Sequence, residues 1–114
     1  MNIILLIYIV MVIIVHDRIK IAKEFANAIN SNKIIKIILF GSVARGDDTE
    51  ESDIDILIIS NHRDEIWTQI ADEIAWFVYD KQELISVHVI SEELFNSTKD
   101  HSFLTNVLNE GVLI

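Results

Sequence analysis

Two aspartates that lie two residues apart, Asp53 and Asp55, are the side chains of this 114-residue chain best spaced to do chemistry. They open an alternating stretch that runs to Ile59, and because side chains on a strand point to opposite faces in turn, both carboxylates are expected on one face. Hard divalent ions such as Mg²⁺ prefer oxygen ligands and keep waters that phosphate oxygens can replace. The pair therefore predicts phosphate chemistry, whereas the competing interpretation is an exposed pair at a strand edge that improves solubility.

Two of the three glycines, Gly41 and Gly46, fall in one short segment directly after the apolar run 34–40. A strand that ends in Gly-Ser and turns into a short helix directs backbone N–H groups outward, which forms an anion-binding concavity. Gly41 would let phosphate approach the chain closely, and Ser42 would add a donor or a metal-facing oxygen. Arg45 is expected either to contact a phosphate or to form a salt bridge with the acidic residues that follow it.

Hydrophobic periodicity supplies the elements that must position these residues. Amphipathic spacing predicts helices and apolar, β-branched runs predict strands; the expected helices cover residues 17–30, 64–80 and 100–110, and the expected strands cover residues 34–40, 53–59 and 84–90. Ser91 is expected to cap a further helix start, and Gly111 to end the last helix in a left-handed conformation. No linker-like stretch interrupts the pattern, so one globular unit is expected.

The N-terminal segment is unusually apolar. Residues 3–15 carry no polar side chain apart from the Tyr8 hydroxyl, but they are fewer than the roughly 20 that a helix needs to cross a bilayer, and the flanks do not match a secretory signal. We therefore expect a domain at 16–114, preceded by a segment 1–15 that is a mis-assigned start with Met11 as initiator, a covered helix extension, or a marginal membrane anchor.

Composition limits the partners. The formal net charge of −9 opposes attraction to a polynucleotide backbone, so no direct nucleic-acid contact is expected, and the short apolar segment argues against a membrane partner. The chain has no cysteine, which excludes disulfides and thiolate metal sites. With no hint of an oxidising compartment, the expected location is the cytoplasm.

The glycine and aspartate motifs together resemble those of a known superfamily. Gly41-Ser42, ten intervening residues and Asp53-Ile54-Asp55 resemble the defining motif of the polymerase-beta-type nucleotidyltransferase superfamily. Leu39 to Gly46 together with Ser52 to Asp55 resemble its minimal nucleotidyltransferase branch, and the likeness covers the chain from about Asp17 to Ile114. The resemblance implies an α/β (α+β) fold in which a small mixed sheet of about three to four strands is flanked by helices.

The resemblance also implies an activity. Gly41 and Ser42 would hold the triphosphate of ATP, and Asp53 and Asp55 would coordinate two Mg²⁺ ions for transfer of AMP with release of pyrophosphate. The usual setting in that family is a toxin–antitoxin pair, in which the nucleotidyltransferase silences a helical, RNA-cleaving HEPN-type toxin by adenylylating a tyrosine. A hetero-oligomer with the toxin is then expected.

One departure from the family pattern concerns the third carboxylate, which relatives supply from a neighbouring strand. The stretch 84–90 has none, and by alternation Ser86 and His88 share a face and would occupy its place. His88 is a candidate general base because imidazole can accept a proton near neutral pH, although a hydrogen-bonded histidine on a polar strand face is the alternative. Glu83 is a weaker candidate that we expect to be solvated. The missing carboxylate leaves a second function open, namely a binding module that neutralises its partner by occlusion.

Overall fold

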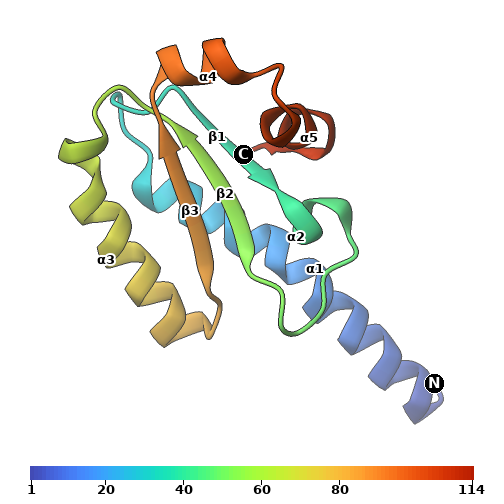
Figure 1. Cartoon of the computed structure of the whole chain (residues 1–114). Coiled ribbons are helices and arrows are strands. Elements are labelled where there is room, and N and C mark those ends of the chain that lie inside the picture. Colours follow the sequence, from blue (N-terminus) through green and yellow to red (C-terminus); the bar gives the residue numbers. More distant parts are fainter.

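The chain folds around one mixed sheet (Figure 1). The computed structural model describes residues 1–11 and 18–114 fully, and residues 12–17 only through their place in the first helix. In chain order the elements are α1 (Ile3–Ile29), β1 (Lys36–Phe40), α2 (Gly41–Arg45), β2 (Ile54–Ile59), α3 (Arg63–Lys81), β3 (Ile85–Ile90), α4 (Glu92–Thr98), α5 (Ser102–Glu110) and β4 (Val112–Leu113). The sheet has four strands in the order β3-β2-β1-β4, which confirms the expected small mixed sheet flanked by helices.

The strand register places three residues in a row across the sheet. β1 pairs with β2 in antiparallel orientation and β2 pairs with β3 in parallel orientation. In this register Phe40 lies opposite Asp55, and Asp55 lies opposite Ser86. The end of β1, the start of β2 and the start of β3 therefore meet beside Asp55.

One face of the sheet is covered by α1, which passes behind the strands in Figure 1, and by α3, which lies to the left of β3 in that view. Leu39 and Ile56 face this side, and they pack with Phe25 of α1 and Phe77 of α3, whose rings meet edge to face at 5.5 Å between centroids. Burying side chains of this size removes about 1.5–3 kcal/mol each of unfavourable exposure to water. The strand at β1 is buried on both faces, as its continuous apolar sequence predicts.

The other face of the sheet is covered only in part, by α4 and α5. Phe95 of α4 and Leu104 of α5 pack here against Phe40 and Leu57. Asp55 alternates with Leu57 along β2 and therefore points to this same face. The carboxylate thus stands on the face that the short C-terminal helices leave partly open.

The helix ends differ from expectation at one glycine. Ser91 caps α4 as predicted, since its hydroxyl oxygen accepts a hydrogen bond from the Leu94 amide at 3.0 Å. The prediction for Gly111 was wrong, because its backbone is extended at φ −73° and ψ 152°. The chain passes from α5 straight into β4, an edge strand that the sequence pattern did not reveal, and a Cβ at Gly111 would collide with the Val107 carbonyl oxygen and the Ile38 side chain.

The N-terminal turns of α1 project beyond the rest of the domain (Figure 1). Residues 3–11 are exposed around the whole helix, and even Ile9, the least exposed of them, has 37% of its surface in solvent. Within the part of the chain that the structure describes, we find no helix with the length and apolarity that a bilayer span requires. The boundary expected between 15 and 16 lies outside the fully described residues.

Candidate active site

The turn from β1 into α2 brings the backbone against a carboxylate. Phe40 ends β1 in extended conformation, and Gly41 starts α2 with φ +75°, a left-handed value that side chains disfavour. A Cβ at Gly41 would collide with the carboxylate of Asp55 and would lie 3.2 Å from its Cβ. The structure therefore brings Gly41 and Asp55 together in van der Waals contact.

The two aspartates repel each other at the start of β2. Asp53 immediately precedes the strand and Asp55 is its second residue, and both side chains are half-buried. Burial is the main cause that raises the pKa of Asp55 above its ordinary value; the charge of Asp53 raises it further, while His88 and Arg45 lower it. The pair is thus an anionic site that a cation would stabilise.

The donor chemistry of this site suits a hard divalent ion. Asp53 and Asp55 offer carboxylate oxygens, and Ser42 adds a hydroxyl oxygen directly after Gly41, the glycine that lies against Asp55. Among the fully described residues, no group of three histidines or carboxylates gathers to make a closed metal site. Mg²⁺ held by this pair would therefore complete its coordination with phosphate and water oxygens, as Mg²⁺ usually does.

Arg45 forms the salt bridge that was the alternative to a phosphate contact. Its Nε donates to Asp47 Oδ2 at 3.2 Å, and Nη1 donates to both carboxylate oxygens of Glu110 at 3.1 Å. Asp47 was one of the acidic neighbours expected from the sequence, whereas Glu110 comes from α5 and was not. The Arg45 side chain remains 44% exposed, so these contacts leave it open to solvent on one side.

On β3, Ser86 and His88 take different places relative to the carboxylates. Ser86 is the residue opposite Asp55. His88 lies two residues further along β3, on the same face and opposite Leu57. The His88 ring stands 6.2 Å from the Phe40 ring and 6.3 Å from the Phe103 ring, between centroids, and is exposed on its remaining side. The neighbouring strand therefore presents a serine beside Asp55, and the imidazole of His88 lies two residues further along β3.

A hollow opens beside His88 between the sheet and the C-terminal helices. Its volume is about 250 Å³ and its lining is mainly apolar. The lining residues come from β2, β3, α4, α5 and the turn before α5: Leu57, His88, Ile90, Leu94, Thr98, His101, Phe103 and Leu104. The site thus continues from the carboxylates along the partly open face into an apolar recess.

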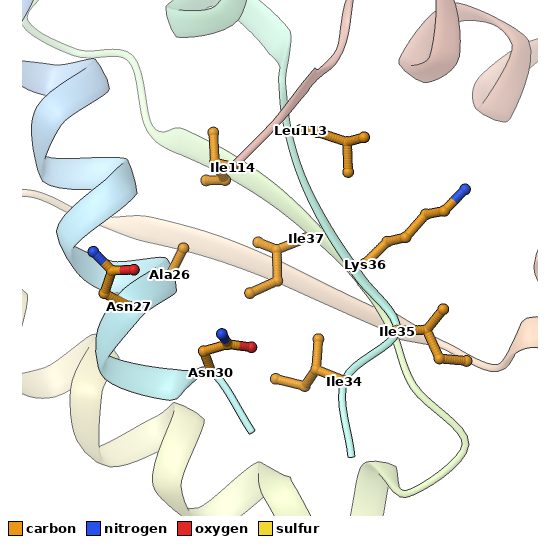
Figure 2. A pocket seen from close by; sticks show the side chains of 9 residues that line it. All are labelled: Ala26, Asn27, Asn30, Ile34, Ile35, Lys36, Ile37, Leu113 and Ile114. Atoms are coloured by element: carbon orange, nitrogen blue, oxygen red, sulfur yellow. The ribbon is translucent and has the colours of Figure 1, made fainter. Parts of the chain in front are cut away.

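A second hollow lies at the opposite end of β1 (Figure 2). It measures about 160 Å³ and lies between the end of α1, the start of β1 and β4. Figure 2 shows its side chains, which are Ala26, Asn27, Asn30, Ile34, Ile35, Lys36, Ile37, Leu113 and Ile114. None of these residues has a carboxylate side chain, and none belongs to the Gly41 turn. This hollow is therefore separate from the candidate active site.

Sequence reasoning missed an arginine behind the site. Arg18 of α1 is only 9% exposed and binds both Glu83 and Asp48. Glu83 is therefore not solvated as expected, because its carboxylate accepts hydrogen bonds from this guanidinium. One signal was available: Arg18 continues the spacing of Ala22 and Phe25, so it stands on the buried stripe of its helix, where a charge requires partners.

Comparisons with known proteins show the family to which the chain belongs. The profile of the nucleotidyltransferase domain family matches residues 19–114. Two proteins of Methanocaldococcus jannaschii, both provisionally named protein adenylyltransferase, are similar to the chain: one is 48% identical over 95 residues, with 81% of this chain and 92% of the relative covered, and the other is 33% identical over 106 residues, with 82% and 95% covered. A crystal structure of a provisionally named nucleotidyltransferase from Sulfolobus solfataricus superposes with a TM-score of 0.57 over 89% of this chain and 83% of its own, and at 24% identity it shows the same fold.

Proposed function

Because the chain belongs to the nucleotidyltransferase domain family and is a nucleotidyltransferase enzyme, we propose that it transfers AMP from ATP to a tyrosine hydroxyl of a protein partner. The observation that carries the proposal is the contact between the Gly41 turn and the Asp55 carboxylate, with Asp53 beside it. The provisional names of the two relatives support adenylyl transfer to protein.

Each residue of the candidate active site has its own role in the proposed transfer. Gly41 and Ser42 receive the triphosphate, and Asp53 and Asp55 hold two Mg²⁺ ions, which when bound neutralise charge on the phosphates. In the transfer, the acceptor oxygen bonds to the α-phosphorus, the bond from that phosphorus to the bridging oxygen breaks, and pyrophosphate leaves. The acceptor proton passes to a base, for which His88 is our candidate because it stands on the same face.

The recess beside His88 supports an aromatic acceptor. In-line displacement requires the acceptor to approach from the side opposite the leaving pyrophosphate. With the triphosphate at Gly41, that side is β3, where Ser86 is small and the apolar recess of about 250 Å³ follows. A phenol ring would fill such a recess and direct its hydroxyl toward Asp55, which a short serine or threonine side chain would not do.

The partner that we propose is an RNA-cleaving toxin of the HEPN type, with this chain as its antitoxin in a hetero-oligomer. This part of the proposal rests on the resemblance of the motifs at 39–46 and 52–55 to minimal nucleotidyltransferases. The net charge of −9 supports a protein acceptor over a polynucleotide. The two proteins would meet in the cytoplasm.

The direct test uses the full chain, a candidate toxin, Mg²⁺ and ATP labelled at the α-phosphate. We expect label on the toxin, no transfer from ATP labelled at the γ-phosphate, and no label after Asp53→Asn or Asp55→Asn in this chain. The matched control is Asp72→Asn, which removes an exposed carboxylate from α3 and should leave the labelling rate unchanged. A toxin tyrosine changed to phenylalanine should lose the label, and equal labelling by the Asp55→Asn variant would contradict the proposal.

The serine opposite Asp55 favours a second candidate, neutralisation by occlusion with weak or no catalysis. If toxin neutralisation survives both aspartate substitutions and no label appears, occlusion is the function. Ser86→Asp separates the two further. In an enzyme it restores a third carboxylate beside Asp55 and should raise the labelling rate, whereas in an occluding module it should change nothing.

A further inference from the structure

We propose that Arg18 of α1 is a positioning residue, which holds the loop 47–53 so that Asp53 stands beside Asp55. The inference rests on the proposed function, because it assigns to Arg18 the placement of a carboxylate that serves nucleotidyl transfer. Arg18 lies on the buried stripe of α1, one turn before Ala22, which is fully buried. The guanidinium therefore extends from the buried side of α1 toward the candidate active site.

The first group of contacts fastens the loop. Nη1 of Arg18 donates to Asp48 Oδ2 at 3.0 Å and to the Thr49 carbonyl at 2.8 Å, and Nη2 donates to the Ser52 carbonyl. The same loop carries a turn in which the Ser52 amide donates to the Thr49 carbonyl at 3.0 Å. Ser52 is the residue before Asp53, so the guanidinium fixes the backbone directly at the point where that aspartate leaves the loop.

The second group of contacts fastens the neighbouring strand. Nε of Arg18 donates to both carboxylate oxygens of Glu83 at 3.1 Å, and Nη2 donates to Oε2 at 2.8 Å. Glu83 lies just before β3, and the carbonyl of the next residue, Leu84, accepts a hydrogen bond from the Ile54 amide at 3.0 Å. One side chain thus links the loop before β2 to the chain before β3, on both sides of Asp53.

Only arginine suits this arrangement. The guanidinium uses all three nitrogens in a planar fork, whereas a lysine ammonium has its three N–H donors on one nitrogen and would leave some of these oxygens unpaired. The charge of Arg18 is already matched by Asp48 and Glu83, whose side chains are 7% and 17% exposed. Arg18 therefore acts on Asp53 through the position of the loop and not by neutralising the carboxylate pair.

The test begins with hydrogen exchange of the metal-free protein. In Arg18→Lys and Arg18→Gln we expect the hydrogen-bonded amides of Thr49, Ser52 and Ile54 to exchange at least about tenfold faster than in the natural chain, while the amides of α3 stay protected. The matched control is Ile70→Val, which trims a buried side chain of α3 and should not loosen the loop selectively. In Arg18→Ala, millimolar guanidinium should restore loop protection and the same concentration of urea should not.

A second readout is metal binding, with Mn²⁺ as the probe because its binding can be followed by spin resonance. We expect the Arg18 variants to bind Mn²⁺ about 10–100-fold more weakly, as when a supporting residue of a metal site is lost. In the transfer assay, kcat should fall while the KM for the acceptor protein stays unchanged.

Loop exchange that is unchanged in the variants, or that rises only together with exchange across α3, would overturn the positioning role. Normal Mn²⁺ affinity in a variant whose loop exchanges faster would overturn the link between the loop and the site. If the natural chain transfers no nucleotide, the proposed function fails on its own, and the exchange and Mn²⁺ comparisons still decide the role of Arg18. Should Arg18→Gln fail to fold, Arg18→Lys and Asp48→Asn supply the same comparison.

Discussion

At Gly41, the lack of a side chain allows the backbone to contact the carboxylate of Asp55. The residue has φ +75°, and the space that a Cβ would fill is taken by Asp55. Gly46 has nearly the same backbone, with φ +79°, but nothing lies within 4 Å of its would-be Cβ. Both glycines thus have a left-handed backbone that side chains disfavour, but only Gly41 also lies close to a carboxylate.

For Gly41→Ala we expect a loss of stability of about 1–2 kcal/mol from the left-handed backbone and a loss of transfer rate of about 100-fold, because Asp55 must move away from its place. Gly46→Ala is the matched control, with a similar loss of stability and near-normal activity. Urea unfolding and the labelling assay measure the two quantities. Equal activity in the two variants would argue against a catalytic position for Asp55.

Asp55 should destabilise the metal-free protein at neutral pH. Its pKa is raised in the folded state, so the stability that it contributes is present below its ordinary pKa of 3.8 and is lost as the pH rises through the folded value. We therefore expect Asp55→Asn to raise the free energy of unfolding at pH 7.5, with a gain that shrinks toward pH 4, while transfer falls by about 100-fold or more. Urea unfolding with a chelator at both pH values measures this, and a variant less stable at pH 7.5 would show that the carboxylate is stabilised by contacts within the chain.

At the scale of elements, the site is a product of strand register and of two short connections. The register places Ser86 beside Asp55, and the α2 turn places Gly41 on its other side. Helix α5 is tied to α2 by the pair Arg45–Glu110 and then turns at Gly111 into β4. The closing strand therefore fastens the helix that borders the apolar recess.

Gly111→Ala is expected to destabilise this connection by about 1–3 kcal/mol, the usual effect of added volume in a packed position. The new methyl group would collide with the Val107 carbonyl oxygen and with Ile38. Urea unfolding measures the change, and the control Leu113→Ala, at an exposed position of β4, should change stability by less than about 0.5 kcal/mol. An unchanged Gly111→Ala variant would mean that α5 can shift freely against β1.

At the scale of the whole molecule, the two faces of the sheet serve different purposes. The face under α1 and α3 is closed and supplies the larger hydrophobic cluster. The other face is only partly covered by α4 and α5, and there Asp55 and Ser86 remain half-buried and His88 exposed. The fold thus keeps a rigid layer behind the strands and leaves room in front of the carboxylates.

Removal of residues 1–10 should leave the free energy of unfolding unchanged within about 0.5 kcal/mol, because the side chains of residues 3–11 are exposed and do not belong to either core cluster. The shortened chain, which begins at Met11, should also associate less with itself, since an exposed apolar surface is lost. Urea unfolding and sedimentation measure the two effects. A loss of more than about 2 kcal/mol would show that the projecting part of α1 supports the domain.

Much of this protein is determined by its local sequence. The amphipathic and β-branched periodicities place α3, β1, β2 and β3 within a few residues, because each element must bury its own apolar face. The spacing of Asp53 and Asp55 places both on one face, since that geometry depends on a single strand.

Only the tertiary structure decided which residues from distant segments complete the site. That Ser86 and not His88 lies opposite Asp55 depends on the register between two strands, which periodicity leaves free to slip. The contacts of Arg18 with Glu83 and of Arg45 with Glu110 each span 65 residues, and β4 and the extended Gly111 arise because the chain end returns to the free edge of β1. Such pairings depend on how the packed elements approach one another, and the local sequence pattern does not predict that approach.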